Sequence, residues 1–114
     1  MISPVHLKIS ASENRGKFKI SDSRFMACID RDRVQFPLLI RRWEKGDYFK
    51  PLGMTGFKKI SDFFVDSKLS LVEKENVWIL TNGEQVVWII GHRLDDRYKI
   101  TPATLNILKL EMVL

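Results

Sequence analysis

Hydrophobic and polar residues alternate along several short stretches of the chain, with the period of two that is typical of half-buried β-strands. Residues 5–10 (VHLKIS) follow this alternation, and residues 25–30 are also predicted to form a strand. Residues 13–16 have the composition of a turn, after which residues 18–20 can return as a partner strand. The N-terminal part of the chain is therefore expected to consist of short strands.

Proline and glycine interrupt the next part of the chain. Residues 34–43 are predicted to be extended, and Pro37 restricts them to an edge strand or a bent strand, because proline cannot donate a hydrogen bond to a sheet. Gly46 and Asp47 indicate a turn. Residues 51–56 (PLGMTG) are predicted to form a loop, since two glycines and a proline in six residues disfavour both helix and sheet.

Two short helices are predicted in the middle of the chain. Residues 60–68 carry an isoleucine and two phenylalanines at helical spacing, and Ser61 or a neighbour can cap this helix. Ser70 and Glu73 have the spacing of a capping box, in which each side chain accepts a hydrogen bond from the other residue's backbone amide. Asn76 is expected to end this second helix.

A β-hairpin is the most specific local prediction. Residues 77–80 and 85–90 are rich in Val, Ile and Trp, which favour strands. Between them lie Asn82 and Gly83, and both residue types tolerate the positive φ that a two-residue turn requires.

The C-terminal part is predicted to contain a loop at residues 91–97, a short strand at residues 98–101 and a longer segment at residues 104–113. In the longer segment leucine and methionine alternate as in a strand, although some of them also fit a helix; a strand is favoured. Six to eight strands with two short helices, and no strand–helix–strand repeat, predict an α+β domain.

Composition agrees with one small soluble domain. The chain has 114 residues, of which 45% are hydrophobic and 29% are charged. No apolar run approaches the roughly 18 residues of a membrane span, and the first residues lack the pattern of a secretory signal. The single cysteine, Cys28, excludes an internal disulfide; it lies in an apolar strand, where thiols are usually inert, and we expect a reducing, cytoplasmic setting.

The net charge of +5 is concentrated in two stretches. Residues 1–20 are net +3, and residues 41–68, with seven basic and four acidic side chains, are also net +3. Residues 21–40 are neutral and residues 69–114 are net −1. If the two basic stretches meet in space, they form a face suited to polyanions; otherwise the lysines are scattered over a solvated surface.

The residue patterns of common active sites are missing from the sequence. The loop at residues 53–59 lacks the spacing of a phosphate-binding P-loop, and no dinucleotide-binding glycine motif occurs. His6 and His92 have no partner at metal-ligand spacing. Asp95 and Asp96 are more typical of a solvated or arginine-paired turn than of a metal site. The sequence therefore predicts no catalytic residue, no metal site and no cofactor site in this chain.

Basic, aromatic and glycine residues gather in the middle of the chain, where cations can neutralise phosphates and glycines allow close approach of the backbone. The cations are Arg41, Arg42, Lys45, Lys50, Lys58, Lys59 and Lys68. Phe57 can stack on a base, although a place in the core is the commoner role of a phenylalanine. The other aromatic residues expected in the core are Trp43, Phe49, Phe63, Phe64, Trp78 and Trp88.

A known family shares much of this middle segment. Residues 41–64, RRWEKGDYFKPLGMTGFKKISDFF, resemble the C-terminal domain of bacterial tRNA(Ile)-lysidine synthetases. The family pattern is R-x-W-x-x-G-D, then P-L-G-M-x-G-x-K-K, then S-D-F-F and a lysine. In this chain it falls on Arg41, Trp43, Gly46, Asp47, Pro51 to Met54, Gly56, Lys58, Lys59, Ser61 to Phe64 and Lys68.

The resemblance continues further along the chain. Residues 86–101, VVWIIGHRLDDRYKIT, resemble the family's closing hairpin and its G-x-R-x-D-x-R-[FY]-K-[IV] segment. Altogether the resemblance covers about 60 of the 114 residues, within residues 41–103. Residues 1–40 carry none of its motifs and are expected to be strands that lead into the domain.

This resemblance implies a fold and a function. The fold is a small mixed β-sandwich with helices, similar to a domain of the phenylalanyl-tRNA synthetase β subunit. The whole enzyme is an ATP- and Mg-dependent ligase that attaches lysine to the wobble cytidine of isoleucine tRNA with a CAU anticodon. In the family this chemistry belongs to an N-terminal adenylating domain with an S-G-G-x-D-S loop, and that loop is missing here.

We therefore expect residues 1–114 to be a single C-terminal tRNA-binding domain, inactive alone and without a cofactor of its own. Its expected partners are the tRNA acceptor stem and the enzyme's N-terminal catalytic domain. For phosphate contact, the resemblance favours Lys58 and Lys59 first, then the set Arg41, Arg42, Lys45 and Lys68.

Further roles follow from the same motifs. Arg93, in the closing segment, can contact RNA or pair instead with Asp95 or Asp96. Gly46, Gly53 and Gly56 shape loops. Asp47 and Asp62 would repel phosphate, so turn-holding or capping suits them better.

Two alternatives to RNA binding are open. The first is a structural or dimerisation domain of the same enzyme, because residues 77–80 and 85–90 can pair between chains, as a homodimer, if they lie at a sheet edge. The second is a free-standing small enzyme, which is disfavoured because no catalytic constellation is present.

Overall fold

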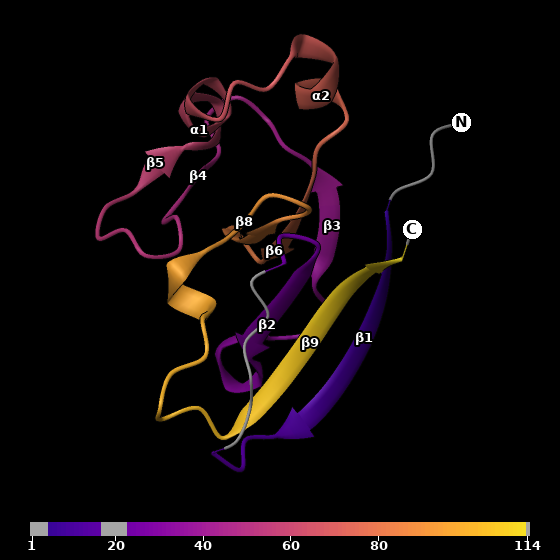
Figure 1. The fold of residues 1–114 in the computed structure, drawn as a ribbon, viewed down its shortest axis with the longest axis vertical. Helices are drawn as coiled ribbons and strands as arrows, with labels where there is room; N and C mark the ends of the chain where they lie inside the picture. The colour runs from indigo at the N-terminus through magenta and orange to yellow at the C-terminus, as the bar shows by residue number, and fades with distance from the viewer. Residues whose placement is uncertain (1–4, 17–22, 114) are drawn as a thin grey trace.

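Antiparallel strands dominate the structure, a computed structural model that describes residues 5–16 and 23–113 (Figure 1). The strands are β1 (His6–Glu13), β2 (Met26–Asp30), β3 (Leu39–Arg42), β4 (Tyr48–Phe49), β5 (Lys58–Lys59), β6 (Trp78–Asn82), β7 (Gln85–Ile89), β8 (Arg93–Leu94) and β9 (Asn106–Val113). They form a sheet of order β1-β9-β2, a sheet of order β3-β6-β7-β8 and the ribbon β4-β5. The predicted strand at residues 18–20 lies outside the described residues.

The first sheet is organised around β9, which pairs with β1 along its whole length and with β2 on its other side. This confirms the strand predicted at residues 104–113. Leu108 and Leu110 lie opposite Ile29 and Ala27, and all four side chains are buried. Cys28 of β2 is buried as well, as expected for an inert thiol.

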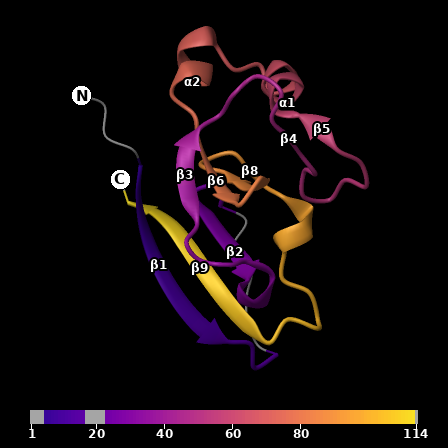
Figure 2. The ribbon, with the colours of Figure 1, turned by 180° about the vertical axis from the view of Figure 1, so that it is seen from behind.

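The second sheet is buried on both faces, which explains the unbroken apolar run in β7. One face shares a core with the first sheet, through side chains that include Leu80, Val87 and Trp88. The other face packs against the ribbon and the helix α1 (Ile60–Asp66). The second helix, α2 (Leu71–Glu75), has no buried residue and lies with α1 at the opposite end of the molecule from the first sheet (Figures 1 and 2). The chain is therefore a three-layer α+β domain.

The hairpin of β6 and β7 has the predicted strands but a shifted turn. Asn82 pairs with Gln85, so the two central residues are Gly83 and Glu84, and Gly83 takes the positive φ, 59°. Asn82 stays in β6 because its side chain is engaged: it accepts a hydrogen bond from the Gln35 amide at 3.1 Å. Both strands lie inside the sheet, so the condition for the alternative of pairing between chains, an edge position of β6 or β7, is not met.

The two predicted helices are present, and their caps differ. The side chain of Ser70 accepts from the Glu73 amide at 3.1 Å and Glu73 accepts from the Ser70 amide at 3.2 Å, which confirms the capping box. Asn76 ends α2 as predicted. The expectation for α1 is wrong, because Lys59 occupies the N-cap position with no side-chain bond and Ser61 lies inside the first turn.

The segment after the hairpin departs most from the predictions. The predicted loop at residues 91–97 contains β8 and the start of a 3-10 turn, Asp96–Tyr98. The predicted strand at residues 98–101 is absent, and Lys99 makes only an isolated bridge to Ile29. The reason is local: the Asp95 side chain accepts from the Arg97 amide at 2.8 Å and starts the turn.

Candidate nucleic-acid interface

The β4-β5 ribbon presents one basic and aromatic face to solvent. Tyr48 lies opposite Lys59, and Phe49 lies opposite Lys58. Because side chains alternate along a strand, the two pairs point to opposite faces of the ribbon. Phe49 is fully buried in the core, whereas Tyr48 and Lys59 are exposed. Phe57, two residues before Lys59, belongs to the same outer face, which we call the ribbon face: Tyr48, Phe57 and Lys59.

The turn that leads into the ribbon is held by an ion pair. The Arg41 guanidinium donates to both carboxylate oxygens of Asp47, at 2.9 and 2.8 Å, and Asp47 also accepts from the Glu44 amide at 2.6 Å. Although burial opposes it, these hydrogen bonds lower the pKa of Asp47, while the bond to Asp47 raises the pKa of Arg41. Gly46 completes the turn with φ 102°. Asp47 holds the turn, as predicted.

The loop at residues 51–56, which we call the glycine loop, is hydrogen-bonded to the closing segment rather than open to a ligand. The Leu52 amide donates to the Leu94 carbonyl at 3.0 Å, and the Gly53 amide donates to the Asp96 carboxylate at 3.0 Å. The Gly53 bond, together with one from Lys99, lowers the pKa of Asp96. The loop's shape therefore depends on residues some forty positions away.

Asp95 is the buried anchor of this closing segment. It is fully buried, accepts from the Lys50 amide at 2.9 Å and forms a two-point ion pair with Arg97 at 3.0 and 2.9 Å. Asp96 pairs with Lys99 at 3.0 Å. The two acids thus form a cation-paired turn. Within the described residues, no group of three His, Cys, Asp or Glu side chains is placed to hold a metal ion.

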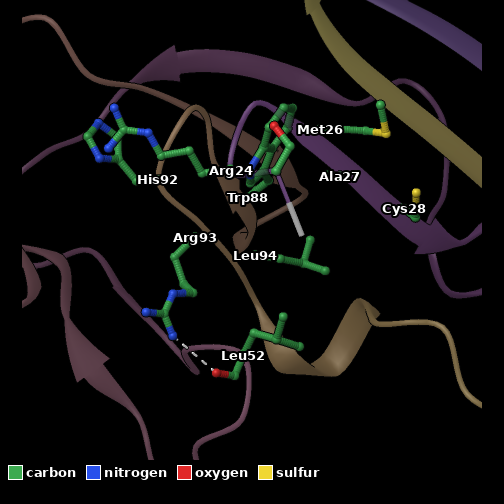
Figure 3. Close-up of a pocket in the computed structure, with 10 residues that line it drawn as sticks. Arg24, Met26, Ala27, Cys28, Leu52, Trp88, His92, Arg93 and Leu94 are labelled. Atoms are coloured by element: carbon green, nitrogen blue, oxygen red, sulfur yellow. Dashed lines mark hydrogen bonds between the residues drawn. The ribbon is translucent and has the colours of Figure 1, made fainter. Parts of the chain in front are cut away.

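Arg93 does not pair with either acid, so that alternative is wrong. Its guanidinium donates to the Leu52 carbonyl at 3.3 Å and lies at the edge of a pocket of about 390 Å³ (Figure 3). His92 and Arg24 lie together on another side of this pocket. Burial, and then repulsion by Arg24, lower the pKa of His92, with Glu73 partly opposing the shift.

The structure divides the other predicted cations into two groups. Four are engaged within the protein: Arg41 with Asp47, Arg42 with the Glu75 carbonyl and the Trp78 ring, Lys50 with Asp96, and Lys58 with Asp66. Three are exposed and form no ion pair with described residues: Lys45, Lys59 and Lys68. The second group is the better placed to meet phosphates.

The two basic stretches do not form one continuous face in the described residues. β1, which carries the described part of the first stretch, lies across the molecule from β5 and α1 (Figures 1 and 2). Lys17 and Lys19 lie outside the described residues. The exposed lysines of the candidate interface therefore come from residues 41–68.

Sequence reasoning missed two members of the interface and misjudged a third. Phe57 is 57% exposed and Tyr48 is 59% exposed, so the common core role does not apply to Phe57. Arg97 was not predicted, yet its guanidinium lies 5.0 Å from the centre of the Phe57 ring. The six aromatic residues expected in the core are buried or partly buried, as predicted.

Comparison with known proteins agrees with this fold. The family described as TilS substrate C-terminal domain matches residues 38–110. The chain belongs to this family. Among curated relatives, a tRNA(Ile)-lysidine synthase from Parabacteroides distasonis is 44% identical over 91 residues, and one from Bacteroides thetaiotaomicron is 41% identical over 96 residues. These alignments cover 80% and 84% of this chain but only 21% and 22% of the relatives. The chain thus spans about a fifth of the relatives' length.

Solved structures share the fold of this TilS C-terminal domain. A crystal structure of a TilS C-terminal domain superposes with a TM-score of 0.76 over 96% of this chain and 86% of that one, at 18% identity. An N-terminal fragment of the phenylalanyl-tRNA synthetase β-subunit from Pyrococcus horikoshii matches 76% of this chain and 27% of that one, with a TM-score of 0.65 and 17% identity. These likenesses confirm the predicted fold. Neither described helix is long and apolar enough to cross a membrane.

Proposed function

We propose that this TilS C-terminal domain holds the acceptor stem of an isoleucine tRNA for a tRNA(Ile)-lysidine synthase. The observation that carries the proposal is Lys59 on the ribbon face, which is exposed and forms no ion pair with any residue that the structure describes, with Lys45 and Lys68 in the same basic stretch. An acceptor stem is an A-form duplex, which proteins recognise mainly by shape and by contacts to phosphates and 2′-hydroxyls. Lysines that no acid neutralises are suited to such contacts.

The engaged cations take different roles in this proposal. Lys58 and Asp66 form a surface ion pair, which contributes little to stability, so a phosphate can replace Asp66. Arg41 is held by two bonds to Asp47 and shapes the turn rather than contacting RNA. Arg93 is exposed beside the glycine loop and can contact a phosphate without losing its bond to Leu52.

The rest of the enzyme is part of the same proposal. The relatives' name and the missing nucleotide-binding motifs favour a separate catalytic domain that binds ATP, Mg and lysine and modifies the wobble cytidine of CAU-anticodon tRNA in the cytoplasm. This chain would supply binding and orientation, with no catalytic residue and no cofactor.

The test is fluorescence anisotropy of the domain with a blunt acceptor-stem minihelix, at several salt concentrations. We expect salt-sensitive binding, because each neutralised phosphate releases counterions. Lys59→Ala should weaken binding and reduce the slope of log affinity against log salt by about one. The matched control is Lys8→Ala, which removes an equally exposed lysine from β1 and should change nothing.

Two results would contradict the proposal. One is a wild-type domain that does not bind the minihelix at any salt concentration. The other is equal affinity of the Lys59→Ala and Lys8→Ala variants with unchanged melting temperatures. A second minihelix with altered stem pairs tells whether the domain reads sequence or only duplex shape. Sedimentation in the same buffers detects self-association of the domain, which is the result expected if it is a structural or dimerisation domain.

A further inference from the structure

Two large aromatic side chains are exposed side by side on the ribbon face. The ring centres of Tyr48 and Phe57 lie 5.6 Å apart at an interplanar angle of 83°. More than half of each residue is exposed, 59% and 57%. A soluble domain usually covers such rings, so a touching pair of exposed aromatic residues indicates a surface with a partner.

A fixed cation completes the aromatic pair. The Arg97 guanidinium lies 5.0 Å from the centre of the Phe57 ring and is held by its two bonds to the buried Asp95. The hydrogen bond to Asp95 raises the pKa of Arg97. The Arg97 side chain is therefore always charged, and it is already held in place before a ligand binds.

A hollow of about 450 Å³ lies against these groups. Its lining is Gly46, Asp47, Tyr48, Phe57, Glu84, Gln85 and Arg97. The volume lies in the range of small-ligand pockets. Asp47 is already paired with Arg41, whereas Glu84 and Gln85 are exposed at the hairpin turn and offer a hydrogen-bond acceptor and an amide.

We propose that Tyr48 and Phe57 form a stacking site for an unpaired nucleobase of the RNA that the domain holds. This inference rests on the proposed function and names the single-stranded part of the substrate. An exposed aromatic pair flanked by Lys59 and Arg97 matches the way proteins bind single-stranded RNA, with bases on aromatic rings and phosphates on cations. A single-stranded extension of the acceptor stem supplies such a base next to the duplex.

The experiment compares a blunt minihelix with the same minihelix carrying a single-stranded 3′ extension that contains 2-aminopurine, whose fluorescence is quenched by stacking. We expect the extension to raise affinity at least about five-fold and its fluorescence to fall on binding. Phe57→Leu keeps an apolar side chain but removes the ring, so it should abolish both effects. Tyr48→Phe keeps the ring and should retain them.

The matched control is Phe36→Leu. Phe36 is also about half exposed, at 51%, with the Arg31 guanidinium 4.3 Å from its ring centre, but it lies outside the ribbon. This variant should behave as wild type. Thermal melts of all variants verify that each one is folded.

The outcomes separate the two proposals. Blunt binding with no gain from the extension, or a gain that Phe57→Leu retains, overturns the stacking site and leaves the proposed function standing. If no minihelix binds, the domain is titrated with the 2-aminopurine strand alone. Quenching that requires Phe57 then supports the stacking site and overturns only the acceptor-stem proposal. No quenching overturns both.

Discussion

The buried carboxylate of Asp95 accepts a hydrogen bond from the Lys50 backbone amide at 2.9 Å, which joins two segments 45 residues apart. On one side of this bond lies the start of the glycine loop, and on the other lies Arg97, which touches Phe57. The ribbon face is thus positioned by a residue that is not itself on the surface.

Replacing Asp95 should destabilise the domain strongly. Asp95→Ala leaves Arg97 without its partner and the Lys50 amide without its acceptor, so the free energy of unfolding should fall by about 3 kcal/mol. Urea denaturation measures this change. The control Glu44→Ala removes an exposed carboxylate and should stay within about 0.5 kcal/mol of wild type. Equal midpoints for the two variants would show that Asp95 is not an anchor.

The glycines of the basic stretch should respond differently to a methyl group. Gly46 has φ 102°, where an alanine is strained, so Gly46→Ala should cost about 1–2 kcal/mol. Gly56 has no positive φ and open space around its α-carbon, so Gly56→Ala should be neutral or slightly stabilising. Thermal unfolding of the two variants provides the comparison. A larger loss at Gly56 would contradict the loop geometry described above.

Stability should decrease in mildly acidic solution because of His92. Its pKa is lowered by burial and by Arg24, so below about pH 6.5 the unfolded chain binds more protons than the folded domain. The free energy of unfolding therefore decreases as the pH falls from 7.5 to 5.5. His92→Gln should flatten this slope, whereas the control His6→Gln, at an exposed histidine of β1, should not. Urea denaturation midpoints measured across this pH range test the prediction. Equal slopes of midpoint against pH for both variants would exclude His92 as the cause.

The sequence predicted elements whose cause is local. The capping box of Ser70 and Glu73 depends on two side chains three residues apart, and the alternation in β9 reflects burial of one face. Their geometry follows from backbone hydrogen bonding and burial alone, without knowledge of the rest of the fold.

Predictions failed where distant residues decide the outcome. The predicted strand at residues 98–101 is replaced by a turn that starts at Asp95, a buried carboxylate that accepts a hydrogen bond from the distant Lys50 amide. The exposure of Phe57 could not be predicted either, because a phenylalanine directly before two lysines fits a core as well as a surface. The partners of Arg41 and Lys58 also became known only from the structure.

The central position of β9 sets an order for folding during synthesis. Among the strands that the structure describes, β1 and β2 have no partner in the first sheet other than β9, which is the last of them and lies up to 107 positions later, at His6 and Val113. Closing so long a segment is slow and entropically costly. While the ribosome is still translating, the second sheet and the ribbon can already assemble from neighbouring residues. The second sheet and the ribbon are therefore expected to mature first, and the first sheet to close only when translation of β9 is complete.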